Sequence, residues 1–95
     1  MGKKLKLVLK YHWFDKIKSG EKNKEYREFK HYWNNRFFRP EGFYSSVEFQ
    51  RGFKKNPEKM EFEIKRIYLS NEPNDLGLDK VWVIELGRRI NSCQR

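Results

Sequence analysis

The chain has few of the residues that cross-link a protein or bind a metal. Cysteine occurs once in its 95 residues, as Cys93 near the C-terminus. A single thiol excludes an internal disulfide framework and a cysteine-rich metal site. The two histidines, His12 and His31, lack further ligands at metal-site spacing. The sequence therefore predicts no bound metal and indicates no other cofactor.

Long apolar segments are also lacking. After Met1 the chain passes directly into alternating lysine and leucine, without the apolar run of a signal peptide. No segment approaches the roughly 20 apolar residues that a transmembrane helix needs. The length allows one core, and no repeat or linker divides it. We therefore expect a single domain over residues 1–95, no membrane contact and a cytoplasmic location.

Positive charge and aromatic rings are abundant by contrast. Lys and Arg number 22 against 13 Asp and Glu, for a net charge of +9, and 17% of the residues are aromatic. So many rings favour a folded chain over a disordered basic tail. The positive excess favours a polyanionic partner, nucleic acid first and an anionic membrane second, although a solvated lysine surface also explains it. Residues 16–39 hold eight basic and three acidic residues, so the excess is concentrated in one quarter of the chain.

Hydrophobic periodicity predicts a mainly β fold with one or two short helices. Strands are expected at 4–10, 24–29, 43–49, 60–70 and 81–86, and helices around 13–17 and 31–38. In the first helix we expect Asp15 in the first turn and Gly20 after the last. Such short strands with helical decoration are typical of a small β-barrel.

Two segments of this pattern need a further interpretation. In 60–70 the apolar residues change from even to odd positions, so either a β-bulge near Lys65 and Arg66 or a change of packing partner is required. The polar residues 88–95 are expected to form a frayed tail.

The segment Ser19–Trp33 combines side chains that can carry chemistry. Glu25 and Arg27 share one face of a predicted strand, and Lys22 precedes it. The planar fork of Arg27 suits a phosphate or a base edge, and Glu25 can orient that fork or accept a hydrogen bond from an exocyclic amine. A structural ion pair between the two is an equally open interpretation. A desolvated Lys22 could act as a base, or it could be an ordinary surface lysine.

Aromatic and basic residues extend this candidate surface. In the predicted second helix Trp33 and Phe37 face the core, and Tyr32 and Arg36 face outward. Tyr32 and Trp33 are candidates for stacking on a nucleobase, and core packing is the stronger alternative for Trp33. The candidate nucleic-acid-binding residues are Lys10, Lys22, Glu25, Arg27, Lys30, Tyr32, Trp33 and Arg36.

The order of these motifs resembles the ASCH domain, a branch of the PUA-like barrels. The resemblance rests on Leu7-x-Leu9-Lys10, Trp13-Phe14-Asp15-x-Ile17, Ser19-Gly20-Glu21-Lys22, Glu25-Tyr26-Arg27, Tyr32-Trp33, Arg36, Ile67-Tyr68-Leu69 and Val83-Ile84-Glu85-Leu86-Gly87. It implies a small PUA-like β-barrel with one or two helices flanking a cleft, and a link to RNA.

Some small ASCH proteins hydrolyse an acetylated cytidine with a lysine, a threonine three residues later and a distant glutamate. Lys22 matches that lysine, but Glu25 stands at the threonine position. A carboxylate is not a hydroxyl nucleophile, so the resemblance does not carry this activity over to the chain.

The sequence thus predicts an RNA- or nucleoside-binding module with a basic cleft, acting as a monomer. The alternative is a hydrolase of a modified nucleoside or RNA with Lys22 and Glu25 as its catalytic residues, because paired titratable groups suit acid–base work. A third possibility is a basic protein that binds an acidic partner.

Overall fold

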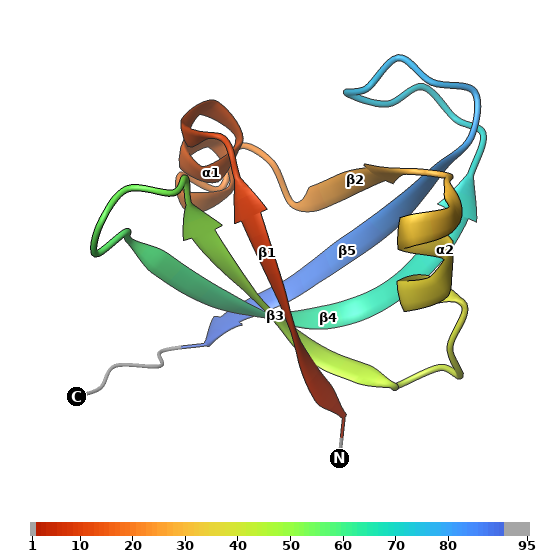
Figure 1. Ribbon diagram of the computed structural model, residues 1–95, viewed down its shortest axis with the longest axis horizontal. Helices are drawn as coiled ribbons and strands as arrows, with labels where there is room; N and C mark the ends of the chain where they lie inside the picture. The colour runs from red at the N-terminus through yellow and green to blue at the C-terminus, as the bar shows by residue number, and fades with distance from the viewer. Residues whose placement is uncertain (1, 91–95) are drawn as a thin grey trace.

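The computed structural model describes residues 2–90, which form one strongly curled sheet with two short helices (Figure 1). The elements in chain order are β1 (Lys3–Leu9), α1 (Tyr11–Lys18), β2 (Lys24–Glu28), α2 (His31–Phe37), β3 (Tyr44–Arg51), β4 (Lys59–Ser70) and β5 (Val81–Ile90). The strand order in the sheet is β1-β3-β4-β5-β2. β1 pairs with β3 in parallel, and the other three pairs are antiparallel.

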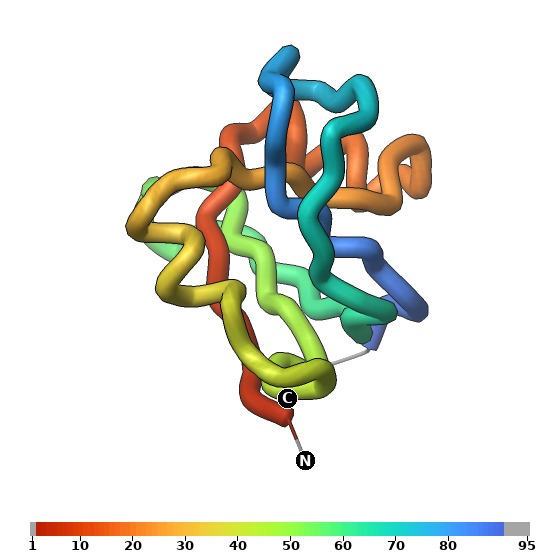
Figure 2. The backbone as a smooth tube through the Cα atoms, turned by 90° about the vertical axis from the view of Figure 1, so that its right-hand side faces the viewer, coloured from red at the N-terminus to blue at the C-terminus, as the bar shows by residue number. Residues whose placement is uncertain are grey.

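The sheet curls into a half-barrel, as Figure 2 shows from the side of α2. The prediction of a mainly β, barrel-like fold with two short helices is therefore confirmed. β1 and β2 are the two edge strands, and each has a hydrogen-bonded neighbour on one side only. Edge strands leave main-chain N–H and C=O groups without strand partners. The two edges are the part of the fold on which the candidate site is built.

Alternating apolar residues of β1 anchor the core, as the sequence predicts. Leu5, Leu7 and Leu9 are all buried, and the same cluster includes Phe14 of α1 and Phe37 of α2. Helices of eight and seven residues are too short to be stable alone. Their positions are consequently fixed by these buried contacts with the sheet.

β4 is irregular where the sequence predicts either a β-bulge or a change of packing partner, and its pairing with β3 ends at Glu63 while its pairing with β5 continues to Ser70. Its register with β5 shifts between Phe62 and Ile64 and again between Ile64 and Arg66. Each shift changes which side chains face the core and bends the strand. The irregular register therefore accounts for the change of apolar phase along β4.

The last strand is longer than the sequence predicts. β5 continues through Ile90, because Arg89 and Ile90 pair with Phe62 and Glu61 of β4. The expectation of a frayed tail from residue 88 was thus wrong for residues 88–90. Residues 91–95 lie outside the described part of the chain.

The expected role of Asp15 was also wrong. α1 begins at Tyr11, and its first turn holds no acidic residue. The Asp15 carboxylate instead accepts two hydrogen bonds of 2.9 Å from the Arg51 guanidinium at the end of β3. Gly20 follows the helix with a φ of +86°, as expected for a residue just beyond a helix end.

Candidate functional site

A cleft of about 410 Å³ lies at the seam between the two edge strands. In Figure 1 this seam separates the end of β1 from β2, with α1 and α2 on either side. The loop from β4 to β5 supplies a further wall. The lining residues are Val8, Leu9, Lys10, Trp13, Lys22, Glu25, Tyr26, Arg27, Glu28, Lys30, Trp33, Asp75 and Leu76.

Lys22 is held between two rings and two carboxylates. Its Nζ lies 4.7 Å from the Trp13 ring centroid and 4.8 Å from that of Tyr26. It contacts the carboxylate of Asp75, and Glu25 Oε1 lies 3.9 Å away. The Lys22 side chain is only 11% exposed. Cation–π contacts and nearby carboxylates both stabilise an ammonium ion, so this arrangement fixes the position of Lys22.

Glu25 is the buried carboxylate at the centre of the site. Its Oε2 lies 2.9 Å from Arg27 Nη2, and its side chain is 7% exposed. Burial raises the pKa of Glu25, while the positive charges of Arg27 and Lys22 oppose that rise. The result is a partly compensated carboxylate between two cations.

Arg27 spans the seam. From β2 its Nη2 donates a hydrogen bond of 3.3 Å to the Val8 carbonyl of β1. Its guanidinium carbon lies 4.9 Å from the Trp33 ring centroid. The Nε atom is buried and has no hydrogen-bond partner within residues 2–90. Arg27 therefore joins the two edge strands, and one of its buried donors is left without an acceptor.

Six of the eight predicted binding residues come together in this cleft. They are Lys10, Lys22, Glu25, Arg27, Lys30 and Trp33. The Trp33 ring also stacks on the Phe37 ring, with the two centroids 5.6 Å apart. Trp33 therefore belongs both to the core and to the wall of the cleft. Tyr32 and Arg36 do not line the cleft. They form an exposed pair, with the Arg36 guanidinium 4.8 Å from the Tyr32 ring centroid.

The sequence reasoning missed Asp75 and assigned Trp13 and Tyr26 no role in a site. Asp75 lies in the β4–β5 loop, 53 positions from its partner Lys22. No local pattern signals that contact. Trp13 follows the apolar pattern of α1, but its ring is half-buried and faces Lys22. The sequence signal that could have indicated Trp13 as a site residue was its position in the first turn of a helix, shortly after the basic end of a strand.

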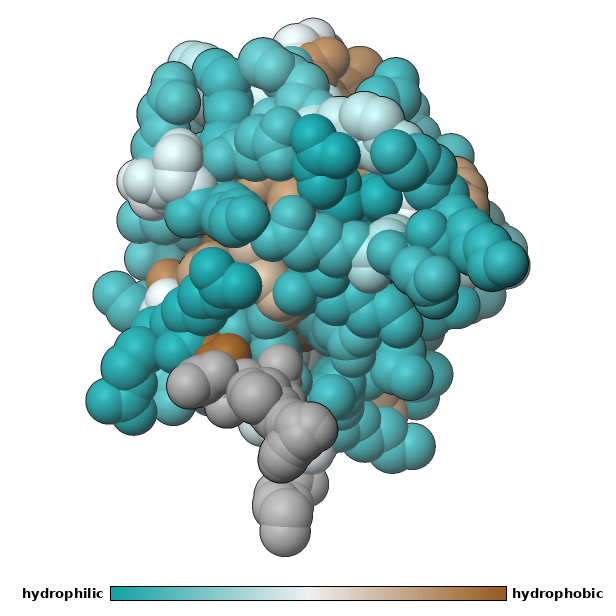
Figure 3. All heavy atoms as spheres, turned by 90° about the vertical axis from the view of Figure 1, so that its left-hand side faces the viewer, coloured by the Kyte–Doolittle hydropathy of each residue, from teal (hydrophilic) through white to brown (hydrophobic). Residues whose placement is uncertain are grey.

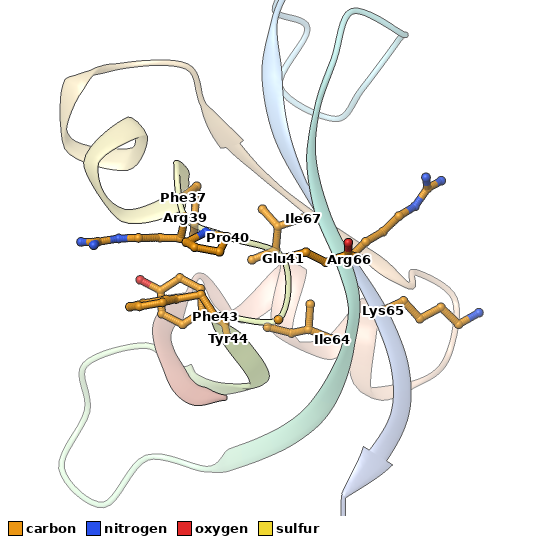
Figure 4. A pocket seen from close by; sticks show the side chains of 11 residues that line it. Phe37, Arg39, Pro40, Glu41, Phe43, Tyr44, Ile64, Lys65, Arg66 and Ile67 are labelled. Carbon is orange, nitrogen blue, oxygen red and sulfur yellow. The ribbon is translucent and has the colours of Figure 1, made fainter. Parts of the chain in front are cut away.

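A second cavity of about 500 Å³ lies between the α2–β3 connection and β4. Figure 4 shows Arg39, Lys65 and Arg66 extending away from this space, while Phe43 and Ile67 border it. Arg66 is paired with Glu85 at 2.7 Å. Since its cations are directed elsewhere, this cavity is a poorer candidate for an anionic or polar ligand.

Residues 2–90 contain neither a metal-binding cluster nor a membrane-spanning helix. No group of three or more His, Cys, Asp or Glu side chains there is placed to hold a metal ion. No helix in the same part of the chain is long and apolar enough to cross a membrane.

Comparisons with known proteins identify no relative. No family model matches the chain, and no curated protein or solved structure matches it either.

The raised pKa of Glu25 predicts a specific pH dependence. A carboxyl group with a higher pKa in the folded state binds its proton more tightly there. The protonation of Glu25 adds most to the free energy of unfolding at pH values below the unfolded-state pKa. This contribution is lost as pH rises through the folded-state pKa. We expect the difference in stability between the parent and Glu25→Gln to fall as pH rises from the unfolded-state pKa through the folded-state pKa.

Urea unfolding of both proteins at a series of acidic pH values checks this prediction. The pKa values of Asp15 and Glu85 are lowered by Arg51 and Arg66, so these groups act in the opposite direction. Their effect is common to both proteins and cancels in the difference. A difference that rises with pH would contradict the assignment.

Proposed function

We propose that the cleft binds one nucleobase, presented by single-stranded RNA or by a free nucleoside, and that the chain is a small ASCH-type member of the PUA-like barrels. The observation that carries this proposal is the Lys22–Glu25–Arg27 network facing the rings of Trp13 and Trp33 across one cleft. Such a site offers donors and an acceptor for a base edge, bordered by aromatic side chains.

The distribution of charge favours a base over a phosphate inside the cleft. Four cationic and three acidic side chains line it. Lys22 is paired with Asp75, Arg27 with Glu25, and Lys30 with Glu28 at 2.8 Å. Paired charges give the interior little net charge, which suits a neutral heterocycle with polar edges. The exposed Lys10 at the rim remains for a phosphate, a contact that positions a nucleic acid without reading its sequence.

The edge strands add main-chain groups to this recognition. Arg27 reaches the Val8 carbonyl, so the free edge of β1 faces the cleft. Unpaired strand edges present N–H and C=O groups at regular intervals. A planar base inserted at the seam would meet such groups from β1 and the side chains of β2.

Replacement of Arg27 tests the cleft directly. We expect Arg27→Ala to weaken binding of single-stranded RNA and of nucleosides by about ten- to a hundredfold, because it removes charge-assisted hydrogen bonds. Fluorescence anisotropy with labelled RNA at two salt concentrations, and quenching of tryptophan fluorescence by nucleosides, measure the two affinities.

Two further variants serve as controls. Arg88→Ala removes the same charge from a side chain that is 82% exposed and paired with Glu63, away from the cleft. It should leave nucleoside binding unchanged. Arg27→Lys keeps the charge but loses the planar fork. If folded Arg27→Ala and Arg27→Lys bind as the parent does, the cleft is not the binding site.

A hydrolase acting on a modified nucleoside or RNA is the second candidate. Asp75 favours it, because this carboxylate is distant in sequence yet contacts Lys22 beside Glu25. The acetylcytidine hydrolases of the ASCH family use a lysine and a distant glutamate, although this chain has Glu25 in place of their threonine. Turnover of acetylated nucleosides or RNA by the parent, lost in Lys22→Ala, would support it. Binding without turnover would restrict the protein to recognition, which in our proposal takes place in the cytoplasm and by a monomer.

A further inference from the structure

A second surface next to the cleft carries exposed rings among lysines. It consists of Tyr11 at the start of α1 and of residues 51–56, the last residue of β3 with the first part of the turn to β4, which we call the hairpin tip. Phe53 in this tip is 86% exposed, more than any other large apolar side chain of residues 2–90, and Tyr11 is 42% exposed. An apolar ring in such a position gives the fold no packing energy.

The hairpin tip is docked on the end of β1. The Gly52 N–H donates to the Leu9 carbonyl at 2.9 Å. Gly52 has a φ of +67°, and a Cβ placed there would lie 2.4 Å from Tyr11 Cε1. Only glycine lets the turn approach the ring so closely. The tip is consequently held against the same strand end, Val8 to Lys10, that lines the cleft.

The cations of this surface divide into two groups. Arg51 lies 4.3 Å from the Tyr11 ring centroid, but its charge is neutralised by Asp15. Within residues 2–90 no ion pair engages Lys10, Lys54 or Lys55. Lys54 Nζ lies 6.0 Å from the Tyr11 ring centroid. Three lysines without an ion-pair partner are therefore close in sequence to the two exposed rings, and one of them, Lys54, lies near the Tyr11 ring.

We propose that the hairpin tip and Tyr11 form a second contact for single-stranded RNA, which continues from the cleft across Lys10 to Phe53. This proposal rests on the proposed function and names the form of its ligand. Exposed rings accept stacked bases, and lysines between them contact phosphates. Lys10 lines the cleft and directly precedes Tyr11, so the two surfaces are continuous.

The surroundings of the tip favour RNA over an anionic membrane. Figure 3 shows the side of the molecule that carries α1 and the β3–β4 turn, where hydrophilic surface separates small apolar areas. Insertion into a lipid interface needs a broader apolar face. Stacking requires only single rings in a basic setting.

Binding of ligands of two lengths tests the proposal. We expect Phe53→Ala to weaken binding of a single-stranded oligouridylate by about tenfold and to leave binding of uridine unchanged. Phe53→Trp should retain oligonucleotide binding, whereas Phe53→Leu should lose it, because leucine is apolar but cannot stack. Replacing Lys54 and Lys55 with alanine should reduce the salt dependence of oligonucleotide binding by about 0.7 in slope for each lysine.

The outcomes separate this proposal from the proposed function. If uridine and the oligonucleotide bind but Phe53→Ala changes neither, the hairpin tip is not a contact and the cleft proposal stands. If the parent binds neither ligand, both proposals fall. If Phe53→Ala instead abolishes binding to phosphatidylserine vesicles and leaves oligonucleotide binding intact, the surface is a membrane contact and the RNA proposal is overturned.

Discussion

Glu25→Ala is expected to lower the free energy of unfolding by about 3–5 kcal/mol, a large share of the stability of a domain of this size. Glu25 is 6% exposed and is the shared carboxylate of Arg27 and Lys22. Its removal leaves Arg27, which is 18% exposed, without its carboxylate. A buried charge that has lost its partner costs more free energy than the pair contributed. Urea unfolding followed by circular dichroism measures the effect.

Replacing the whole network distinguishes this explanation from simple loss of packing. Lys22→Met, Glu25→Leu and Arg27→Met in one protein remove the three buried charges together while filling similar volume. We expect this triple variant to be more stable than Glu25→Ala, since no buried charge is left unpaired and the Asp75 carboxylate that loses Lys22 is 39% exposed. It should bind neither nucleosides nor RNA. If the triple variant is the less stable of the two, packing rather than charge governs this site.

Phe14→Ala is expected to destabilise the protein by about 3–5 kcal/mol and to abolish nucleoside binding. Phe14 is fully buried and, with Ile17, fixes α1 to the sheet. The adjacent Trp13 forms the wall of the cleft against Lys22, so loosening α1 displaces that ring. Chemical denaturation and tryptophan fluorescence with nucleoside report the two effects.

A matched substitution controls for the loss of a ring. Phe53→Ala makes the same change at a side chain that is 86% exposed, and its stability should stay within about 0.5 kcal/mol of the parent. Ile17→Val, which removes one buried methylene, should cost about 1 kcal/mol. A Phe14→Ala protein as stable as these variants would mean that α1 is not held by its buried face.

Local patterns in the sequence predict the elements well, because alternation and helical spacing depend on neighbouring residues. Leu5, Leu7 and Leu9 mark β1, and the change of apolar phase in residues 60–70 marks the irregular register of β4. Gly20 marks the end of α1. The predicted final strand ended too early because Arg88 and Arg89 are polar. In the structure the backbone of β5 pairs with β4 as far as Ile90. Main-chain pairing does not depend on the polarity of the side chain.

The candidate site could be predicted only in part, since its members come from segments far apart in the chain. Glu25 and Arg27 share a strand face, so their pairing follows from local geometry. The approach of Asp75 to Lys22 depends on how the β4–β5 loop is placed by the sheet. The contact of Arg27 with Val8 depends on the curl that brings two edge strands together. Neither arrangement has a signal within any short window of sequence.

The strand order has a consequence for how the protein acquires its binding surface during folding. β1 and β2 are near neighbours in the chain, at residues 3–9 and 24–28, yet each is held by a later strand. β1 forms its strand hydrogen bonds with β3, and β2 forms its own with β5, which begins at residue 81. Non-local pairings of this kind form late, because long loops must close first. On the ribosome, most cleft side chains emerge early but acquire their arrangement only once nearly the whole chain is present. A product that ends before β5 therefore lacks the assembled cleft.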